Sequence, residues 1–357
     1  MLLGALLSNA VGAPPSPPQP EQGSRLIRNL DAGKPQIVVV FGTSLTAGGA
    51  WVGLMKDYLV GKYPGLVTVY NEAGSGHSSV WGLANIHNVT RHAPDAALIE
   101  FAMNDAYYPE REGYTEGVSI DTSRANLRRI VDSIKASNPA CEIFLQTMDV
   151  CLGIHRIRRP LLESYYDGYR KEAAAGKFTL IDHMPKWKAL VDWDTASYVA
   201  WLPDSIHPGA EASAAITLPG VLSAFTGAQV ALDTGLSALY AHGTDIEIKA
   251  VATSPASRVD FYQGKTLIGS DSTYPYSCVW KGAPVGRYLI MARLVQGNTA
   301  VAVSQGIPIK VAVASALNHV TVGRTAKTGG KGRQGRAIAY GGDGKPYLLD
   351  GRKPVFK

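Results

Sequence analysis

The residues of this chain best suited to chemistry are a serine and a histidine that lie far apart in the sequence. Ser44 follows a run of apolar, strand-forming residues at 37–41 and a glycine. His207 comes three positions after Asp204, in a loop bounded by prolines. A serine hydroxyl becomes a nucleophile when a histidine takes its proton and a carboxylate orients that histidine. We therefore predict Ser44 as the nucleophile, His207 as the base and Asp204 as its orienting partner.

Two further residues lie between these segments and could donate hydrogen bonds to negative charge on a substrate oxygen. We expect Gly74 to use its backbone N–H and Asn104 its side-chain amide, beside the Ser44 N–H. Each residue alone has a simpler interpretation, as a helix cap, a loop cap or a glycine needed for a turn. Each follows a strand candidate, however, and the carboxyl edge of an open α/β sheet is where ligands bind. Their shared placement favours the chemical interpretation.

The elements that must position these residues lie between 36 and about 226, where short apolar runs alternate with longer helical patterns. Residues 123–137, for example, carry apolar side chains at spacings of three and four. The strand candidates are 36–41, 67–71, 97–102, 142–148 and 178–182, and the helix candidates are 51–62, 123–137, 161–175 and 185–191. This alternation predicts a parallel five-stranded sheet with helices on both faces, a three-layer α/β/α sandwich.

The pattern changes after residue 226 to short strands separated by turn residues. The candidates are 246–253, 258–263, 266–268, 276–280, 288–295, 299–303 and 307–313. Short strands at this spacing predict a small antiparallel β-sandwich. We therefore divide the chain into a signal peptide with a proline-rich linker (1–35), an α/β domain (36–226), a β-sandwich (227–316) and a basic flexible tail (317–357).

The charge of the chain is concentrated at its C-terminal end. The net charge is +6, and residues 321–357 hold nine Lys and Arg against two Asp. The remaining residues therefore carry a net charge of −1. Because the high isoelectric point comes from the tail, it is no evidence for a nucleic-acid partner. Residues 1–7 form a short apolar run that ends near the small residues of 11–13, as in a secretory signal that lacks its basic start. No run elsewhere approaches the ~18 apolar residues that span a membrane.

Residues 36–226 resemble the SGNH, or GDSL-type, hydrolases, a family named after Ser, Gly, Asn and His in four separated blocks. The matching blocks are 42–45, 71–74, 102–105 and 204–208, of which the last matches most closely. Thr43 stands where the family commonly has Asp, and Ala102 where it usually has Gly. Neither position carries a reacting atom, so we expect these departures to alter local geometry and substrate fit only.

The resemblance implies a flavodoxin-like SGNH fold and ester hydrolysis through an acyl-enzyme, without a cofactor. It places Ser44, Gly74 and Asn104 in the oxyanion hole. His77, Tyr107 and Tyr108 follow the second and third blocks and are candidate substrate-binding residues. No metal site is expected, because His87 and His92, predicted on a helix or its end, are five positions apart, which fits no common zinc motif. The absence of a Gly-x-Ser-x-Gly sequence argues against the unrelated α/β-hydrolase family.

Residues 259–269 and 274–280 resemble bacterial immunoglobulin-like modules, in which a Phe-Tyr hairpin and a Pro-Tyr-x-x-x-Trp strand recur. Such modules are appended to secreted and cell-surface proteins, so we expect a secreted bacterial esterase with the module as a spacer or adhesion element. The expected substrate is a short acyl ester, acetylated polysaccharide above all, with the module and basic tail contacting cell-surface polymer. A general short-chain carboxylesterase, a lysophospholipase-like enzyme, a peptidase and a non-catalytic surface protein remain alternatives.

Overall fold

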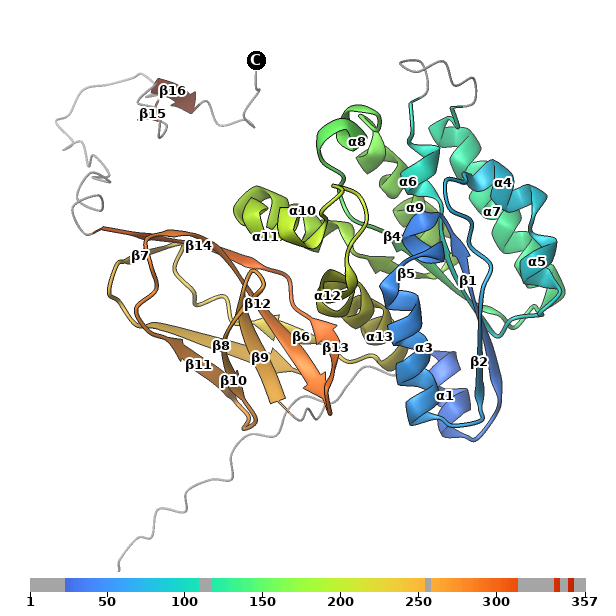
Figure 1. Ribbon diagram of the computed structural model, residues 1–357, viewed down its shortest axis with the longest axis horizontal. Coiled ribbons are helices and arrows are strands. Elements are labelled where there is room, and N and C mark those ends of the chain that lie inside the picture. Colours follow the sequence, from blue (N-terminus) through green and yellow to red (C-terminus); the bar gives the residue numbers. More distant parts are fainter. Residues whose placement is uncertain (1–22, 109–116, 254–257, 314–336, 341–345, 350–357) are drawn as a thin grey trace, which may run out of the picture. The chain divides into compact units, whose positions relative to one another are not determined.

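The computed structural model describes residues 23–108, 117–253 and 258–313, and the backbone of 337–340 and 346–349 (Figure 1). The predicted signal peptide lies outside the described residues. Part of the predicted linker does not, and there the prediction is wrong. Residues Arg25–Asp31 form helix α1, capped by the Ser24 side chain, and bury Leu26, Ile27 and Leu30 in the core. This helix was not predicted because its seven residues make only two turns, too few to show a helical period.

The α/β part is built on a parallel sheet of five strands in the order β2-β1-β3-β4-β5. The strands are β1 (Gln36–Gly42), β2 (Val67–Asn71), β3 (Ala96–Glu100), β4 (Glu142–Thr147) and β5 (Thr179–Asp182). Each lies within two residues of its predicted bounds. The central strands are nearly continuous apolar runs because helices cover both faces of a parallel sheet. The predicted sheet is confirmed.

Helices cover the two faces of this sheet, as the alternation along β1 shows. Val38 and Val40 pack in one cluster with α1, α3 and α13, whereas Val39 and Phe41 pack in another with α7 and α9 (Figure 1). The three-layer arrangement is therefore confirmed. The helices are α2 (Ser44–Ala47), α3 (Ala50–Lys62), α4 (Ser79–Ala84), α5 (His87–Thr90), α6 (Ala102–Asp105), α7 (Ile120–Ser137), α8 (Gly153–Ile157), α9 (Leu162–Gly176), α10 (Met184–Trp193), α11 (Thr195–Trp201), α12 (Ala210–Ala212), the π-helix η2 (Ser213–Thr217) and α13 (Leu218–Thr226).

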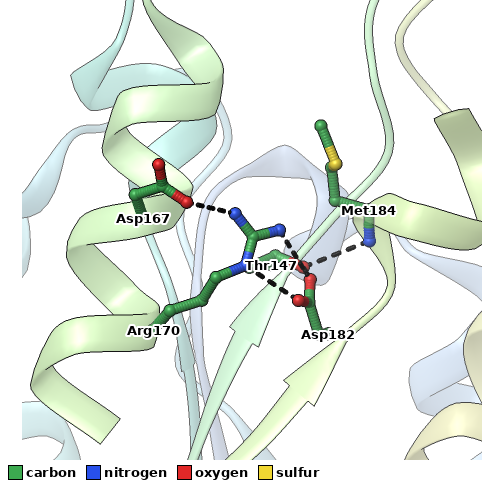
Figure 2. A network of polar contacts seen from close by, with 5 residues as sticks. All are labelled: Thr147, Asp167, Arg170, Asp182 and Met184. Atoms are coloured by element: carbon green, nitrogen blue, oxygen red, sulfur yellow. Dashed lines mark hydrogen bonds and ion pairs between the residues drawn. The ribbon is translucent and has the colours of Figure 1, made fainter. Parts of the chain in front are cut away.

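A polar network fastens α9 to the carboxyl ends of β4 and β5 (Figure 2). Arg170 on α9 donates to both carboxylate oxygens of Asp182, from Nε at 2.8 Å and Nη2 at 3.1 Å, and also binds Asp167. Thr147 Oγ1 donates to Asp182 Oδ1 at 2.6 Å and accepts from the N–H of Met184 at 3.2 Å. A guanidinium that binds a carboxylate through two hydrogen bonds fixes the orientation of the two groups relative to each other. The network thereby ties the carboxyl edge of the sheet to α9.

The β-rich part consists of two sheets. The larger has the order β10-β9-β12-β14-β7 with β13 also paired to β12, and the smaller has the order β11-β8-β6. The strands are β6 (Val230–Leu232), β7 (Leu239–Ala241), β8 (Ile246–Ala252), β9 (Arg258–Gln263), β10 (Thr266–Asp271), β11 (Tyr276–Trp280), β12 (Gly286–Gln296), β13 (Thr299–Val303) and β14 (Ile307–Ala312). All seven predicted strands are present. Three-residue β6 and β7 are too short for periodicity to reveal, and β7 pairs with β14 in parallel rather than antiparallel fashion.

Beyond residue 313 the structure describes only a two-stranded hairpin. Strands β15 (Ala337–Tyr340) and β16 (Pro346–Leu349) pair antiparallel. This pairing within the basic tail was not predicted from the sequence. The other residues of that tail lie outside the described part of the chain.

Candidate active site

The turn between β1 and α2 presents Ser44 at the carboxyl edge of the sheet. Thr43 is the N-cap of α2, and its side chain accepts from the N–H of Leu45 at 3.2 Å. The residue before Thr43 must be glycine, because a Cβ at Gly42 would lie 2.4 Å from both the carbonyl oxygen and a carboxylate oxygen of Glu100. The strand can therefore turn sharply into a helix whose first residue is Ser44.

Ser44, His207 and Asp204 form a continuous chain of hydrogen bonds. Ser44 Oγ lies 2.8 Å from His207 Nε2, and His207 Nδ1 lies 2.6 Å from Asp204 Oδ2. The other carboxylate oxygen of Asp204 accepts from the backbone N–H of His207 at 2.8 Å and of Ile206 at 3.1 Å. The structure thus brings Ser44 together with His207, 163 positions away, in the hydrogen-bond pattern of a serine and its base.

The carboxylate of Asp204 is held in its ionised form. Partial burial acts to raise its pKa, but the hydrogen bonds from the N–H and ring of His207 outweigh that effect and lower the pKa below its ordinary value. A permanently negative carboxylate is suited to orient an imidazole and to stabilise the cation that forms on it. It need not take up the proton itself.

Asn104 is oriented by two contacts at the start of α6. Its Nδ2 donates to the carbonyl oxygen of His77 at 3.0 Å, and its Oδ1 accepts from Nη2 of Arg159 at 3.3 Å. These contacts distinguish the nitrogen from the oxygen end of the amide and leave the second Nδ2 hydrogen available. The geometry is compatible with the predicted role of Asn104 as a donor to an oxyanion.

Gly74 does not fit the role predicted for it. Its N–H donates to the carbonyl oxygen of Gly42 at 2.9 Å, so this donor is already used within the fold. A Cβ at Gly74 would lie 2.5 Å from the His77 ring and 2.8 Å from Trp81, so the position needs glycine for packing. Two residues further along, Gly76 is exposed at φ +77°, and its N–H makes no hydrogen bond to another described residue. The signal in the sequence was the second glycine of Gly74-Ser75-Gly76.

Two of the predicted substrate-binding residues, His77 and Tyr107, contact Asn104. The His77 ring stacks on Trp81 with centroids 4.4 Å apart, and the N–H of Tyr107 donates to the carbonyl oxygen of Asn104 at 3.2 Å. The Arg159 guanidinium lies 5.3 Å from the centre of the Tyr107 ring, and Tyr108 is 46% exposed. Their placement agrees with the sequence analysis, and their role in binding stays a prediction.

A cavity of about 420 Å³ opens at the serine and histidine. Its lining residues are Ser44, Leu45, Gly48, Gly49, Trp51, Ser75, Met148, His207, Pro208 and Ser213. Buried Trp51 is fixed by a hydrogen bond from Nε1 to the carbonyl oxygen of Leu45 at 2.9 Å. Ser75, Met148 and Ser213 belong to no sequence motif and were not predicted as cavity residues. The volume falls within the range of small-molecule sites.

Beneath the turn lies a fully buried carboxyl group, Glu100 at the end of β3. It accepts from the N–H of Thr43 at 2.7 Å, from Thr43 Oγ1 at 2.9 Å and from Thr46 Oγ1 at 2.8 Å. Burial raises the pKa of Glu100 to about 7, although these hydrogen bonds act to lower it. Glu100 therefore anchors the residues on both sides of Ser44 while titrating near neutral pH.

This buried carboxyl group predicts a pH-dependent stability. Because its folded-state pKa lies above the ordinary value of 4.5, its stabilising contribution is full below pH 4.5 and is lost as the pH rises through about 7. The wild type should lose on the order of 3 kcal/mol more than Glu100→Gln in free energy of unfolding between pH 4.5 and 8. Urea unfolding at several pH values measures this, with exposed Glu163→Gln as control. Parallel curves for wild type and Glu100→Gln would contradict the prediction.

Family models match both parts of the chain. Residues 40–215 match the GDSL-like lipase/acylhydrolase family and residues 237–292 match the bacterial Ig domain. A GDSL esterase/lipase of Arabidopsis thaliana is 30% identical over 118 residues, which cover 31% of this chain and 47% of that protein. The chain thus spans about half the length of this curated relative.

Solved structures similar to the α/β part include three enzymes. An acetylxylan esterase from Geobacillus stearothermophilus aligns with a TM-score of 0.47 and 21% identity, over 54% of this chain and 94% of its own. An α/β hydrolase from the Lake Arreo metagenome aligns with 0.46 and 19%, over 54% and 95%. A lipase/acylhydrolase from Enterococcus faecalis aligns with 0.43 and 23%, over 52% and 92%.

The family matches confirm the two resemblances drawn from the sequence and the class of enzyme that they imply. Among the described residues no helix is both long and apolar enough to cross a membrane. Residues 40–215 of this chain thus form a GDSL-like lipase/acylhydrolase domain, and residues 237–292 form a bacterial Ig domain.

Proposed function

We propose that this chain is a serine esterase that hydrolyses short-chain acyl esters, with acetyl groups on polysaccharide as the favoured substrate. The observation that carries the proposal is the hydrogen-bonded chain of Ser44, His207 and Asp204 at the mouth of a cavity of about 420 Å³. A buried structural network of the same residues would not need an open cavity or a side-chain exposure of 44% at His207.

The arrangement supports acyl transfer in two steps. Ser44 Oγ attacks the ester carbonyl carbon while its proton passes to His207 Nε2, and the tetrahedral intermediate then expels the alcohol, which takes that proton. The acyl group is left as an ester on Ser44. Water loses a proton to His207 Nε2 and attacks this ester, releasing the carboxylic acid and restoring the serine hydroxyl. Asp204 stays ionised throughout and holds His207 in one orientation.

We assign three donors to the oxyanion of each tetrahedral intermediate. They are the N–H of Ser44, the free Nδ2 hydrogen of Asn104 and the N–H of Gly76, which replaces the Gly74 donor predicted from the sequence. The N–H of Ser44 opens helix α2 and, like that of Gly76, has no backbone partner among the described residues. Preorganised donors of this kind stabilise developing charge at little reorganisation cost.

The cavity supports a short acyl group. Trp51 is 1% exposed and Met148 is 2% exposed, so both belong to the packed core where they line the cavity. A close-packed core does not open further for a long chain without loss of packing. The polysaccharide half of the proposal rests on the bacterial Ig domain, which accompanies secreted and cell-surface enzymes. A general short-chain carboxylesterase is the alternative function. We also propose, on the same ground, that the protein is secreted.

The test compares acyl chain lengths on one leaving group. The purified chain should hydrolyse p-nitrophenyl acetate with a kcat/KM at least about tenfold above that for p-nitrophenyl octanoate, because unfavourable packing of a few methylene groups is worth 1.4 kcal/mol or more. Acetate release from acetylated xylan and acetylated pectin then identifies the alcohol half. Equal rates on the two p-nitrophenyl esters would refute the short-chain preference. Acetyl release from neither polymer would favour the general carboxylesterase.

A further inference from the structure

Strand β12 of the Ig-like domain buries side chains on both of its faces. Ile290, Ala292 and Leu294 belong to a cluster that holds the inner side chains of the sandwich and continues into the core around α3 and α13, whereas Leu289 and Met291 belong to a separate cluster. Successive side chains of a strand point to opposite faces of the sheet, and an antiparallel sheet with one solvated face would show polar residues there. The second face of β12 is therefore an interior surface.

The partners of this second face are helices of the hydrolase domain. Leu289, Met291 and Val303 share their cluster with buried side chains of α10, α11, the residue after α11, α12 and η2: Trp187, Leu190, Tyr198, Trp201, Leu202, Ala212, Ala215 and Ile216. Arg293 extends the same face, with its guanidinium 3.7 Å from the centre of the Tyr262 ring and 5.9 Å from that of Trp201. Cation–π contacts strengthen where, as here, burial removes water.

Helix α11 leads directly into the loop that carries Asp204 and His207. The loop folds back on the last residues of that helix, because Gly209 N–H donates to the carbonyl oxygen of Trp201 at 2.9 Å and Ser205 N–H to that of Leu202 at 2.9 Å. A displacement of Trp201 therefore moves both ends of the loop.

The Ig-like domain also reaches the other elements that hold this loop. Gln263 Nε2 donates to Asp194 Oδ2 at 3.2 Å, and Asp194 caps the start of α11 through the N–H of Ser197 at 3.1 Å. Strand β13 contacts η2, which follows the loop and carries cavity residue Ser213. The start of α11, its end and the helix after the loop thus all rest on this domain.

We propose that the Ig-like domain positions the Asp204–His207 loop, with Met291 and Arg293 as positioning residues; this inference rests on the proposed function of Ser44. The loop itself is open, since the side chains of His207 and Asp204 are 44% and 52% exposed. Its geometry must nevertheless keep Nε2 within 2.8 Å of Ser44 Oγ. A misplacement of about 1 Å can cost about 10²-fold in rate. The domain expected from the sequence to be a spacer is thereby part of the catalytic framework.

The test uses point variants of the full chain and a control on the same strand. Met291→Ala and Arg293→Met should each lower kcat for p-nitrophenyl acetate about tenfold or more, with KM within about twofold. Ile290→Ala removes an equally buried side chain of the neighbouring residue, on the opposite face of β12, and should leave kcat within about twofold. Met291→Leu should restore the wild-type kcat, because it refills the volume.

All variants are assayed at a temperature where circular dichroism shows them folded, so that loss of kcat is separated from loss of protein. Should Met291→Ala not fold, the kcat values of Arg293→Met and Arg293→Lys test the inference without it. Equal kcat values for interface and control variants would overturn the inference, whether both stay at wild type or both fall. Wild-type turnover no faster than Ser44→Ala would instead overturn the proposed function, which distinguishes the two failures.

Discussion

Ser44→Ala should lower kcat for p-nitrophenyl acetate by about 10⁴- to 10⁶-fold, to the level of the oxyanion donors acting on water alone. The physical reason is that no other described hydroxyl is placed against His207 Nε2, which lies 2.8 Å from Ser44 Oγ. Initial rates of p-nitrophenol release measure the loss. In the same experiment a fluorophosphonate should label the wild type at one residue, identified by peptide mass analysis as Ser44, and should leave the variant unlabelled.

Ser75→Ala is the matched control for this prediction. Ser75 lines the same cavity as Ser44, yet its hydroxyl has no hydrogen bond to a base in the described structure. Its replacement should change kcat by no more than a few fold. Substantial turnover by Ser44→Ala, or labelling at Ser75, would show that a different hydroxyl is the nucleophile.

The second large effect concerns Asn104. Asn104→Ala should lower kcat by about 10²- to 10³-fold and leave KM nearly unchanged, because the amide binds the oxyanion more strongly than the ground-state carbonyl. Asn104→Asp should be at least as damaging. The carboxylate can still accept from Arg159, which binds Asn104 Oδ1 at 3.3 Å, but it cannot donate and it places negative charge near the oxyanion. Steady-state kinetics of both variants with p-nitrophenyl acetate provide the measurement.

Asn138→Ala controls for the loss of a structural asparagine. Asn138 donates to the carbonyl oxygen of Pro94 at 3.0 Å, where β4 and β3 begin, and so lies at the opposite edge of the sheet. The kcat of Asn138→Ala should remain near that of the wild type. A large rise in KM for Asn104→Ala at constant kcat would assign Asn104 to substrate binding rather than to oxyanion stabilisation.

Much of the fold could be predicted because the deciding forces act locally. The run 37–41 is apolar at every position, as a strand covered by helices on both faces must be, and 123–137 repeats at the helical period. The ends of the elements were predicted less accurately. Helix α7 begins at Ile120 rather than at 123, because the Ser119 hydroxyl caps it by accepting from the N–H of Thr122. Helix α1 was missed because two turns show too little periodicity.

The oxyanion donors show where local reasoning stops. Gly74 and Gly76 are equivalent as letters in the same short loop, and both follow β2. Only the folded chain shows that the N–H of Gly74 is bound to the carbonyl oxygen of Gly42 and that Gly76 lies at the exposed turn. A hydrogen bond to a residue 32 positions away depends on strand pairing, which no pattern within the loop encodes.

The sequence by itself predicted the parallel sheet, the strands of the Ig-like domain and the candidate site residues Ser44, Asn104, Asp204 and His207, because periodicity and loop placement are local properties. Tertiary structure decided which side chains meet: that Ser44 Oγ and His207 Nε2 lie 2.8 Å apart, that the Gly74 N–H is already bound, and that Met291 shares a buried cluster with the helix before the histidine loop. These depend on packing between elements distant in the chain, where shape and burial select one arrangement among many.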